Sequence, residues 1–323
     1  MEIMAMSITL FNSIKRMKKL CFIIICVSFL TKANAQQDPM YSMYMFNTMA
    51  INPAYAGSLD HAQVVGLFRR QWLNFPGSPR TANLTYHTPL KNENVGLGFS
   101  FVNDQVGDMS TNGFLAAYSY HVKFKKSRLA LGLQAGARNF SLALNDIKLS
   151  PTPGQSDDAF SGNISQWSLN FGAGAFWYSP NWYIGLGIPN LRNNILSDNQ
   201  INTAFVARYR THMNLTGGYV FKVSPTIRIK PSFMVKHVGG APLQIDLNAN
   251  VYWLDLIGFG VSYRSKDAIV LLAELQLNRN IRIGYAYDQT VSSLAGYTGG
   301  SHELMLRFDF GFNKNKTLTP RFF

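Results

Sequence analysis

From about residue 63 onward, apolar and polar residues alternate along the chain in short stretches. The last stretch is the clearest, with Leu304, Leu306 and Phe308 at every second position and Arg307 and Asp309 between them. Successive side chains of a β-strand point to opposite faces. This pattern therefore predicts a strand with one apolar and one polar face.

Turn-forming residues such as Gly, Pro, Asn, Asp and Ser separate these stretches and divide the chain into strands. The predicted strands are 63–72, 81–88, 95–103, 112–124, 127–140, 167–179, 181–188, 208–222, 225–237, 242–254, 256–265, 268–278, 279–288 and 302–312. An even number of spanning strands is typical of closed bacterial outer-membrane barrels. We therefore predict an all-β fold, a 14-stranded antiparallel transmembrane β-barrel over residues 62–323.

Two other classes of protein are alternatives to the barrel. The longest apolar run, from Leu20 to Leu30, is shorter than the ~18 residues that a spanning helix needs, which excludes a polytopic helical membrane protein. A soluble two-sheet sandwich is the open alternative, but it would have to cover the apolar face of every strand. Aromatic residues such as Trp167, Trp177 and Trp253 near predicted strand ends favour the membrane, where such rings form interfacial girdles.

Connection lengths predict the orientation of the barrel. Barrels of this class have short periplasmic turns and longer external loops. The second, fourth and later even-numbered connections are short, whereas most odd-numbered ones are longer, notably 103–112, 141–166, 189–207 and 289–301. We therefore expect both termini to be periplasmic. The short connections 239–242 and 265–267 break this rule.

The first 35 residues have the three parts of a secretory signal. Lys18 and Lys19 precede an apolar run, and Ala33-Asn34-Ala35 provides a cleavage site. We predict a signal peptide over residues 1–35. Met17 stands immediately before the basic residues of this signal. A start at Met17 is therefore favoured over a signal peptide whose basic amino-terminal region includes residues 1–16. Both cysteines of the chain lie before the cleavage site, so disulfides and thiol chemistry are not expected in the mature protein.

The segment after the cleavage site, residues 36–61, departs from the alternation. It is rich in Met and Tyr and reads QDPMYSMYMFNTMAINPAYAGS over residues 37–58. Asp38 and Pro39 are suited to begin a short helix, and Asn52-Pro53 to end it. So many large apolar residues make a disordered segment improbable and require an apolar partner surface.

This segment resembles the amino-terminal signature of the PorP/SprF family of type IX secretion outer-membrane proteins of the Bacteroidetes group. Similar family blocks follow along the mature chain. They are FRRQWLNFPGSPRTANLTYHTPL at 68–90, GLGFSFVNDQVGDMSTN at 96–112, FGAGAFWYSPNWYIGLGIPNL at 171–191, PSFMVKHVGGAPLQIDLNANVYW at 231–253 and GSHELMLRFDF at 300–310. The resemblance implies a barrel that supports secretion and cell-surface display of cargo proteins, in some members gliding adhesins. It also implies as partners outer-membrane lipids, the type IX translocon with its periplasmic subunits, and the carboxy-terminal domain of the cargo.

A barrel of 14 strands should have a narrow lumen that no folded domain can pass, so we expect a docking or anchoring role. Residues 36–58 are either a plug that folds back into the barrel or an exposed motif that binds a partner. The residues expected to act in either role are Tyr41, Tyr44, Phe46, Asn47, Asn52, Pro53, Tyr55 and Gly57. Phe310, Phe312 and the final Phe323 fit the terminal aromatic signal that outer-membrane assembly machinery favours. A diffusion porin for small solutes is the alternative function.

Candidate chemistry changes this picture little. The six histidines show neither HExxH nor HxH spacing, so we predict no metal site, no catalytic site and no cofactor. The chain has 30 Lys and Arg against 17 Asp and Glu. Such a balance can indicate nucleic-acid binding. An exported chain rarely meets nucleic acid, so we predict no nucleic-acid partner.

Overall fold

The computed structural model describes residues 39–91, 93–143, 163–191, 195–196, 207–208 and 210–311. Three short 3-10 turns precede the strands: η1 (Tyr44–Phe46), η2 (Thr48–Ala50) and η3 (Pro53–Tyr55). The strands are β1 (Ala62–Arg70), β2 (Arg80–Pro89), β3 (Val95–Val106), β4 (Met109–Lys123), β5 (Arg128–Leu142), β6 (Ile164–Tyr178), β7 (Trp182–Ile188), β8 (Ile195–Leu196), β9 (Ala207–Arg208), β10 (His212–Tyr219), β11 (Phe221–Lys222), β12 (Ile227–Val238), β13 (Gln244–Trp253), β14 (Ile257–Arg264), β15 (Ala268–Gln276), β16 (Ile281–Thr290) and β17 (Ser301–Phe310).

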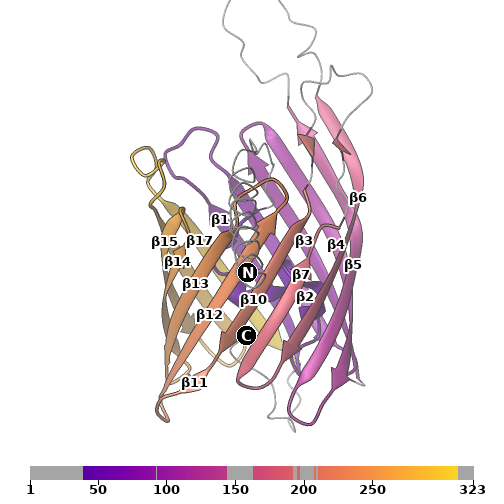
Figure 1. Cartoon of the computed structure of the whole chain (residues 1–323), viewed down its shortest axis with the longest axis vertical. Helices are drawn as coiled ribbons and strands as arrows, with labels where there is room; N and C mark the ends of the chain where they lie inside the picture. The colour runs from indigo at the N-terminus through magenta and orange to yellow at the C-terminus, as the bar shows by residue number, and fades with distance from the viewer. Residues whose placement is uncertain are drawn as a thin grey trace, which may run out of the picture.

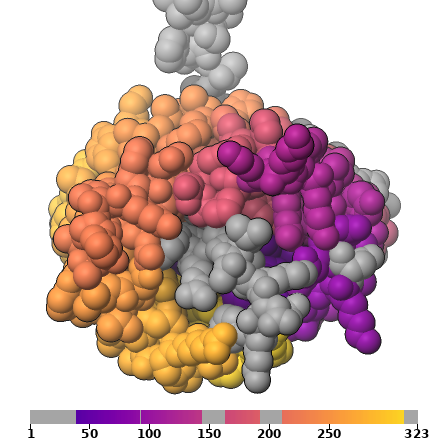
Figure 2. Space-filling view, turned by 90° about the horizontal axis from the view of Figure 1, so that it is seen from below, coloured from indigo at the N-terminus to yellow at the C-terminus, as the bar shows by residue number. Residues whose placement is uncertain are grey.

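The strands form a closed antiparallel barrel (Figure 1). Each wall strand pairs with its neighbours along the chain, and β1 pairs with β17 from Ala62 opposite Phe310 to Arg70 opposite His302. β10 and β11 both pair with β12 and together make one wall strand, so the wall has 14 strands, as predicted. One end of the barrel, here called the tight-turn end, carries the short turns between β4 and β5 and between β6 and β7. Seen from this end, the wall is a ring whose colours follow the order of the chain (Figure 2).

The alternation of the sequence separates the two faces of the wall. On β17, Leu304 and Leu306 are more than half exposed on the outside, whereas Glu303 and Arg307 are buried on the inside. The apolar outer face suits contact with lipid. Across the described ranges, no helix is long and apolar enough to cross a membrane.

One of the long connections predicted from the sequence is wrong. Residues 103–112 were expected to form a loop, but β3 continues to Val106 and β4 begins at Met109. Asn103 donates a hydrogen bond to Asn112 across the two strands, with 2.7 Å between Nδ2 and Oδ1. Their polar side chains thus pair with each other and extend the ladder beyond the alternating stretch, which leaves only a two-residue turn.

The buried core of the molecule lies inside the barrel. Residues 39–61, here called the inner segment, fill space between the inward side chains of the wall. One apolar cluster joins Tyr41, Met43, Tyr44 and Phe46 to β1, β12, β13, β15, β16 and β17. The other joins Met49, Ala54, Tyr55 and Ala56 to β4, β5, β6 and β7. The inner segment therefore replaces the water that would otherwise fill the lumen.

The segment inside the barrel as a candidate functional site

The inner segment is a series of three 3-10 turns and not the single helix expected from the sequence. Asn52 and Pro53 begin η3, although the sequence suggested that they would end a helix. The Asn52 side chain accepts a hydrogen bond from the backbone N–H of Ala54 at 3.0 Å, and Pro53 occupies the first position of the turn. Proline fits there because it has no N–H to satisfy and its φ is already set.

Charged side chains of the wall anchor the beginning of the segment. The backbone N–H groups of Ser42 and Met43 each donate to the Glu303 carboxylate at 2.8 Å. The Ser42 hydroxyl donates to Asp288 at 2.7 Å and accepts from Arg69 at 2.7 Å. Arg69 also pairs with Asp288 at 2.8 Å and with Glu303 at 3.2 Å. These bonds to charged groups are buried and are stronger than bonds between neutral groups.

A second arginine completes this charge network. Arg264 donates to Asp246 at 3.0 Å, to Asp288 at 3.2 Å and to the Ser42 hydroxyl at 3.2 Å. Its guanidinium also lies 3.4 Å from Asp267. The two buried arginines thus have carboxylate partners on β13, β16 and β17 and in the β14–β15 turn. Removing one partner would leave a buried charge without compensation.

Neutral polar side chains hold the middle of the segment. Asn47 donates to Asn83 at 2.9 Å and accepts from Thr85 at 2.8 Å, both on β2. On the other side, the Tyr44 hydroxyl accepts from Asn248 on β13 at 3.0 Å. Burial raises the pKa of Tyr44 well above its ordinary value, so this phenol stays protonated. The segment is therefore bonded both to β2 and to β13, which lie six strands apart around the wall.

Close packing against wall glycines holds the end of the segment. A Cβ atom built at Gly132 on β5 would overlap the backbone of Pro53 and Ala54. One at Gly174 on β6 would overlap the Asn52 side chain, whose amide donates to the Ala175 carbonyl at 3.0 Å. These glycines let the inner segment approach the wall backbone directly. The sequence analysis did not single them out as contacts.

Gly57 has a specific conformational reason to be glycine. Its φ of +67° lies in the left-handed region, and a Cβ there would also meet the backbone of Pro89 and Gly96. Tyr55, two residues earlier, packs edge-on against His87 and Phe176 with ring centroids 5.2 and 5.3 Å apart. Both contacts bring the chain to the tight-turn end of the barrel, where β1 begins.

A titratable group lies at this junction. His61 Nδ1 is 2.7 Å from Asp60, and Nε2 is 3.4 Å from Asp309 on β17. Burial lowers the pKa of His61, but the bonds to Asp309 and Asp60 more than offset this effect and leave the pKa above its ordinary value. Asp309 is also bonded to Gln63 and Arg307, at 2.9 Å each. These contacts of His61 attach the end of the inner segment to the first and last strands.

The structure places the residues singled out in the sequence as follows. All eight residues of the segment, Tyr41, Tyr44, Phe46, Asn47, Asn52, Pro53, Tyr55 and Gly57, are buried inside the barrel. Phe310 ends β17 and stacks on Tyr86 with ring centroids 6.2 Å apart. Phe312, Phe323 and the predicted signal peptide lie outside the described residues, so their assignments stay predictions.

The sequence analysis missed most of the wall residues that receive the segment. Arg69, Arg264 and Asp288 belong to the family blocks or to alternating strands but were not predicted to contact residues 36–61. A usable signal was present, because both arginines occupy inward positions of strands that were correctly predicted. Among the described residues, no group of three or more His, Cys, Asp or Glu side chains is arranged to hold a metal ion.

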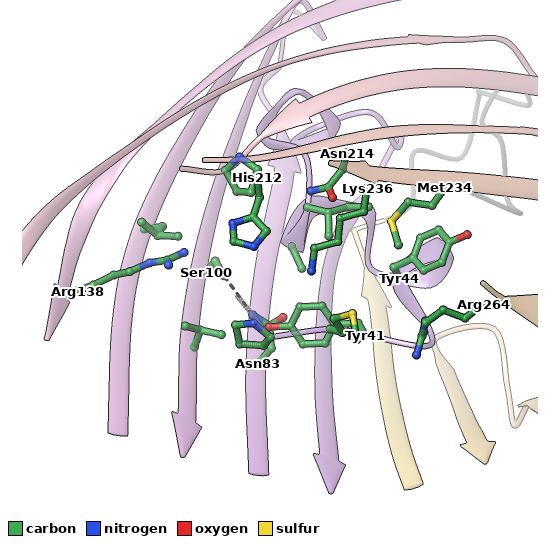
Figure 3. A pocket seen from close by; sticks show the side chains of 17 residues that line it. Tyr41, Tyr44, Asn83, Ser100, Arg138, His212, Asn214, Met234, Lys236 and Arg264 are labelled. Atoms are coloured by element: carbon green, nitrogen blue, oxygen red, sulfur yellow. Dashed lines mark hydrogen bonds between the residues drawn. The ribbon is translucent and has the colours of Figure 1, made fainter. Parts of the chain in front are cut away.

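A small cavity lies beside the beginning of the inner segment (Figure 3). Its volume is about 60 Å³. Tyr41, Tyr44 and Ile51 of the segment line one side, and inward residues of the wall, such as Arg138 and Lys236, line the other. Most wall residues of the lining lie in the half of the barrel that carries the longer connections. The described part of the inner segment thus runs from this half towards the tight turns.

The sequence of this barrel also matches a known protein family. A family model described as type IX secretion system membrane protein PorP/SprF matches residues 33–308. The chain belongs to this family. The resemblance noted in the sequence is thereby confirmed, and the barrel with its apolar outer face is that of an outer-membrane protein of the PorP/SprF family.

Solved structures similar to this PorP/SprF barrel are other outer-membrane proteins. The CymD monoaromatic hydrocarbon channel has a TM-score of 0.47 at 12% identity and covers 84% of this chain and 93% of its own. The Ralstonia pickettii toluene transporter TbuX has a TM-score of 0.47 at 10% identity, with 88% and 96% covered. An outer membrane protein of Acinetobacter baumannii has a TM-score of 0.43 at 11% identity, with 79% and 100% covered. A comparison with curated protein sequences finds no match.

Proposed function

We propose that this protein is an outer-membrane component of the type IX secretion system that supports secretion or surface anchoring of cargo by docking to the translocon or to the cargo. In this proposal the cargo does not pass through the barrel of this protein. The observation that carries this proposal is the burial inside the lumen of residues 41–58, all of which are buried except the half-buried Ala50 and Ile51. Membership of the PorP/SprF family supplies the link to secretion.

The bonds of the inner segment across the lumen support a plug. Ser42 is bonded to Glu303 on β17, and Asn52 is bonded to Ala175 on β6, a strand in another part of the wall. A 14-stranded barrel lies between small barrels, whose side chains fill the interior, and the 16–18-stranded porins with aqueous channels. With the segment in place, the lumen has no room for a folded domain. The polar inner wall thus serves to hold the segment, which counts against a diffusion porin.

The alternative role of the segment as a partner motif would require it to leave the barrel. Tyr41, Tyr44, Phe46 and Tyr55 are each less than a tenth exposed, so a partner cannot reach them in this state. Withdrawal would also break the charge network around Ser42. We therefore propose that residues 39–61 act as a plug and that partners contact the ends of the barrel.

The lengths of the connections support a proposal for the orientation in the membrane. We propose that the tight turns face the periplasm, where the end of β17 and the secretion subunits meet, and that lipid contacts the apolar outer face. The wall residues next to Ser42 lie at the other end of the barrel, because Arg69 is the last but one residue of β1 and Arg264 is the last residue of β14. The predicted periplasmic position of the mature amino terminus falls on residues outside the described ranges and stays a prediction.

Purification in detergent tests the docking role. The native protein should retain translocon subunits or a cargo carboxy-terminal domain, identified by mass spectrometry. A porin would emerge alone and conduct small ions. Isolation without partners, together with steady open-pore conductance of the intact protein, would contradict the proposal.

Thiol labelling tests the plug separately. The mature chain is predicted to have no cysteine, so Met49→Cys and the matched control Ser265→Cys each introduce a single thiol. Met49 is buried in the lumen and Ser265 lies in the β14–β15 turn. We expect a membrane-impermeant maleimide to label only the control in folded protein, and both after unfolding. Deleting residues 40–57 should raise single-channel conductance. Rapid labelling of both cysteines, or an unchanged conductance, would contradict the plug.

A further inference from the structure

Two arginines lie side by side on the outer face of the wall. Arg70 is the last residue of β1 and Arg80 is the first residue of β2, and the two are paired directly across these strands. Both side chains are exposed. They take the outward positions, because Arg69 and Thr81 beside them are buried and neighbours along a strand face opposite ways. The pair therefore lies on the lipid side of the barrel, at the end opposite the tight turns.

No residue that the structure describes balances this pair. Neither guanidinium forms an ion pair or a side-chain hydrogen bond with a described residue. Arg69, in contrast, has two carboxylate partners inside the barrel. Like charges directly opposite each other on neighbouring strands destabilise a sheet. An anion bound between the two guanidiniums would turn this repulsion into attraction.

Polar side chains flank the two arginines. His302 on β17 is paired with Arg70, and its Nδ1 lies 2.5 Å from the Tyr285 hydroxyl on β16. Gln105 on β3 is paired with Arg80 and is exposed. The next outward residues towards the tight-turn end are apolar, so this polar row marks the edge of the apolar band of the barrel. Lipid headgroups meet a barrel wall at such an edge.

An apolar groove on the outer face begins beside this row. Its volume is about 750 Å³. Phe68 and Leu304, paired across β1 and β17, line it, and each is two positions away from Arg70 or His302. The groove continues across β16, β15 and β14. Its one acidic residue, Glu274, is buried and pairs with Arg282, so the groove itself suits an acyl chain.

Gly66 in this groove has no reason within the described chain to be glycine. Its φ is not positive, and a Cβ there would meet only the Leu306 carbonyl oxygen, at 3.9 Å. It faces outward, away from the inner segment, because Val65 and Leu67 are buried. Glycine inside a strand weakens the strand and often marks the close approach of a ligand or of another backbone. At Gly66 that approach has to come from the lipid side.

We propose that Arg70, Arg80 and this groove bind a lipid that carries a phosphate monoester. Each guanidinium can donate two hydrogen bonds to the phosphate oxygens, and an acyl chain lies in the groove over Gly66. A phosphate monoester carries a charge of about −1.5 to −2 at pH 7, which matches two arginines better than the smaller charge of a diester. The site does not depend on the proposed docking role. With the tight turns towards the periplasm, as proposed above, it lies in the external leaflet.

A second groove on the outer face lacks such a pair of cations. It has a volume of about 340 Å³ and is lined by residues such as Leu84, Phe99 and Ala116. The outward residues beyond it are Asn103 and Asn112, which are bonded to each other. This groove can receive an acyl chain but offers no charge to a phosphate. It is therefore a control within the same protein.

Native mass spectrometry of the purified full-length mature protein in detergent tests the site. The probes are dipalmitoyl phosphatidic acid, a phosphate monoester, and dipalmitoyl phosphatidylcholine, which has the same chains and a zwitterionic diester headgroup. Phosphatidic acid should bind about tenfold or more tightly than phosphatidylcholine, because only its headgroup gains strong charged hydrogen bonds. Dipalmitoyl phosphatidylglycerol, an anionic diester, should bind with intermediate affinity.

Variants tie this binding to the two arginines and to the groove. Arg70→Gln and Arg80→Gln should each weaken phosphatidic acid binding by about tenfold. The matched control is Lys266→Gln, which removes an exposed positive charge from the β14–β15 turn at the same end of the barrel and should bind like the parent. Gly66→Leu fills the groove and should also weaken binding, whereas Ala116→Leu in the second groove should not.

Unchanged heat-modifiable migration in gels shows that each variant is folded. Equal affinity for phosphatidic acid and phosphatidylcholine would overturn the proposal, as would equal affinity of the arginine variants and Lys266→Gln. Dimers that Gly66→Leu dissociates would identify a second copy of the chain as the occupant of the groove and would also overturn it. None of these results depends on whether secretion partners are retained, so failure here is distinct from failure of the docking role.

Discussion

The two halves of the inner segment are fixed inside the same barrel by different forces. Residues 41–47 are bonded to wall charges and amides, chiefly through Ser42 and Asn47. Residues 52–58 approach wall glycines so closely that a side chain at any of these glycines would collide with the segment. The first half depends on polar and charged side chains of the wall, whereas the second half depends on wall positions that have no side chain. Substitutions that remove groups should therefore loosen the first half, and substitutions that add atoms should displace the second.

The largest effect should follow from Arg69→Met. This change leaves the buried Glu303 without the cation that pairs with it at 3.2 Å, and Asp288 with only Arg264. The expected loss in the free energy of unfolding is about 3–5 kcal/mol. Chemical unfolding in detergent measures it. Hydrogen exchange should show faster exchange at residues 42–47 than at 52–58.

The matched control for Arg69→Met is Arg228→Met. Arg228 pairs with Asp255, but both side chains are partly exposed to solvent. Exposed ion pairs contribute about 0–1 kcal/mol. Equal destabilisation by the two substitutions would show that the charge network around Ser42 does not hold the first half.

Gly132→Val should act on the second half. The added side chain would overlap the backbone of Pro53 and Ala54, and overpacking of this kind costs about 1–3 kcal/mol or more. Thiol labelling of Met49→Cys in this background should become rapid as the segment is displaced. Gly239→Val is the control, since a Cβ at Gly239 meets nothing within 4 Å. Protection of Met49→Cys in both variants would argue against close packing as the cause.

Asn52→Ala removes the polar contacts that accompany this packing. The Asn52 amide donates to the Ala175 carbonyl, and its oxygen caps η3. Loss of a cap and one buried hydrogen bond should lower the free energy of unfolding by about 1–2 kcal/mol. Asn139→Ala, which removes an exposed bond to Ser165, should cost less. If both cost the same, the Asn52 contacts do not matter to the folded state.

The smallest effect should be a dependence on pH at the junction of the inner segment and β1. The pKa of His61 is raised in the folded protein, so its protonation stabilises the folded state. This contribution is complete below the ordinary histidine pKa of about 6.5 and is lost as the pH rises through the raised value. The difference in melting temperature between the parent and His61→Gln should therefore shrink at alkaline pH. A difference that grows with pH would contradict the assigned contacts.

The alternation of residues predicted the wall because it reports a local property. Leu304 and Arg307 take opposite faces of β17 wherever the strand lies, so 14 strands and their lipid-facing side followed directly. The loop predicted at 103–112 was wrong, because polar residues also pair in a ladder when a partner strand is near. Asn103 and Asn112 are such a pair.

The sequence by itself determined that residues 37–58 form an apolar segment in need of a partner surface, together with the family to which the chain belongs. Only the tertiary structure decided that Ser42 meets Arg69, Asp288 and Glu303, and that Ala54 rests on Gly132. These residues are brought together by closure of the barrel, which joins β1 to β17. A periodic pattern fixes the face on which a side chain lies, but contacts across the lumen depend on the register and curvature of the whole wall.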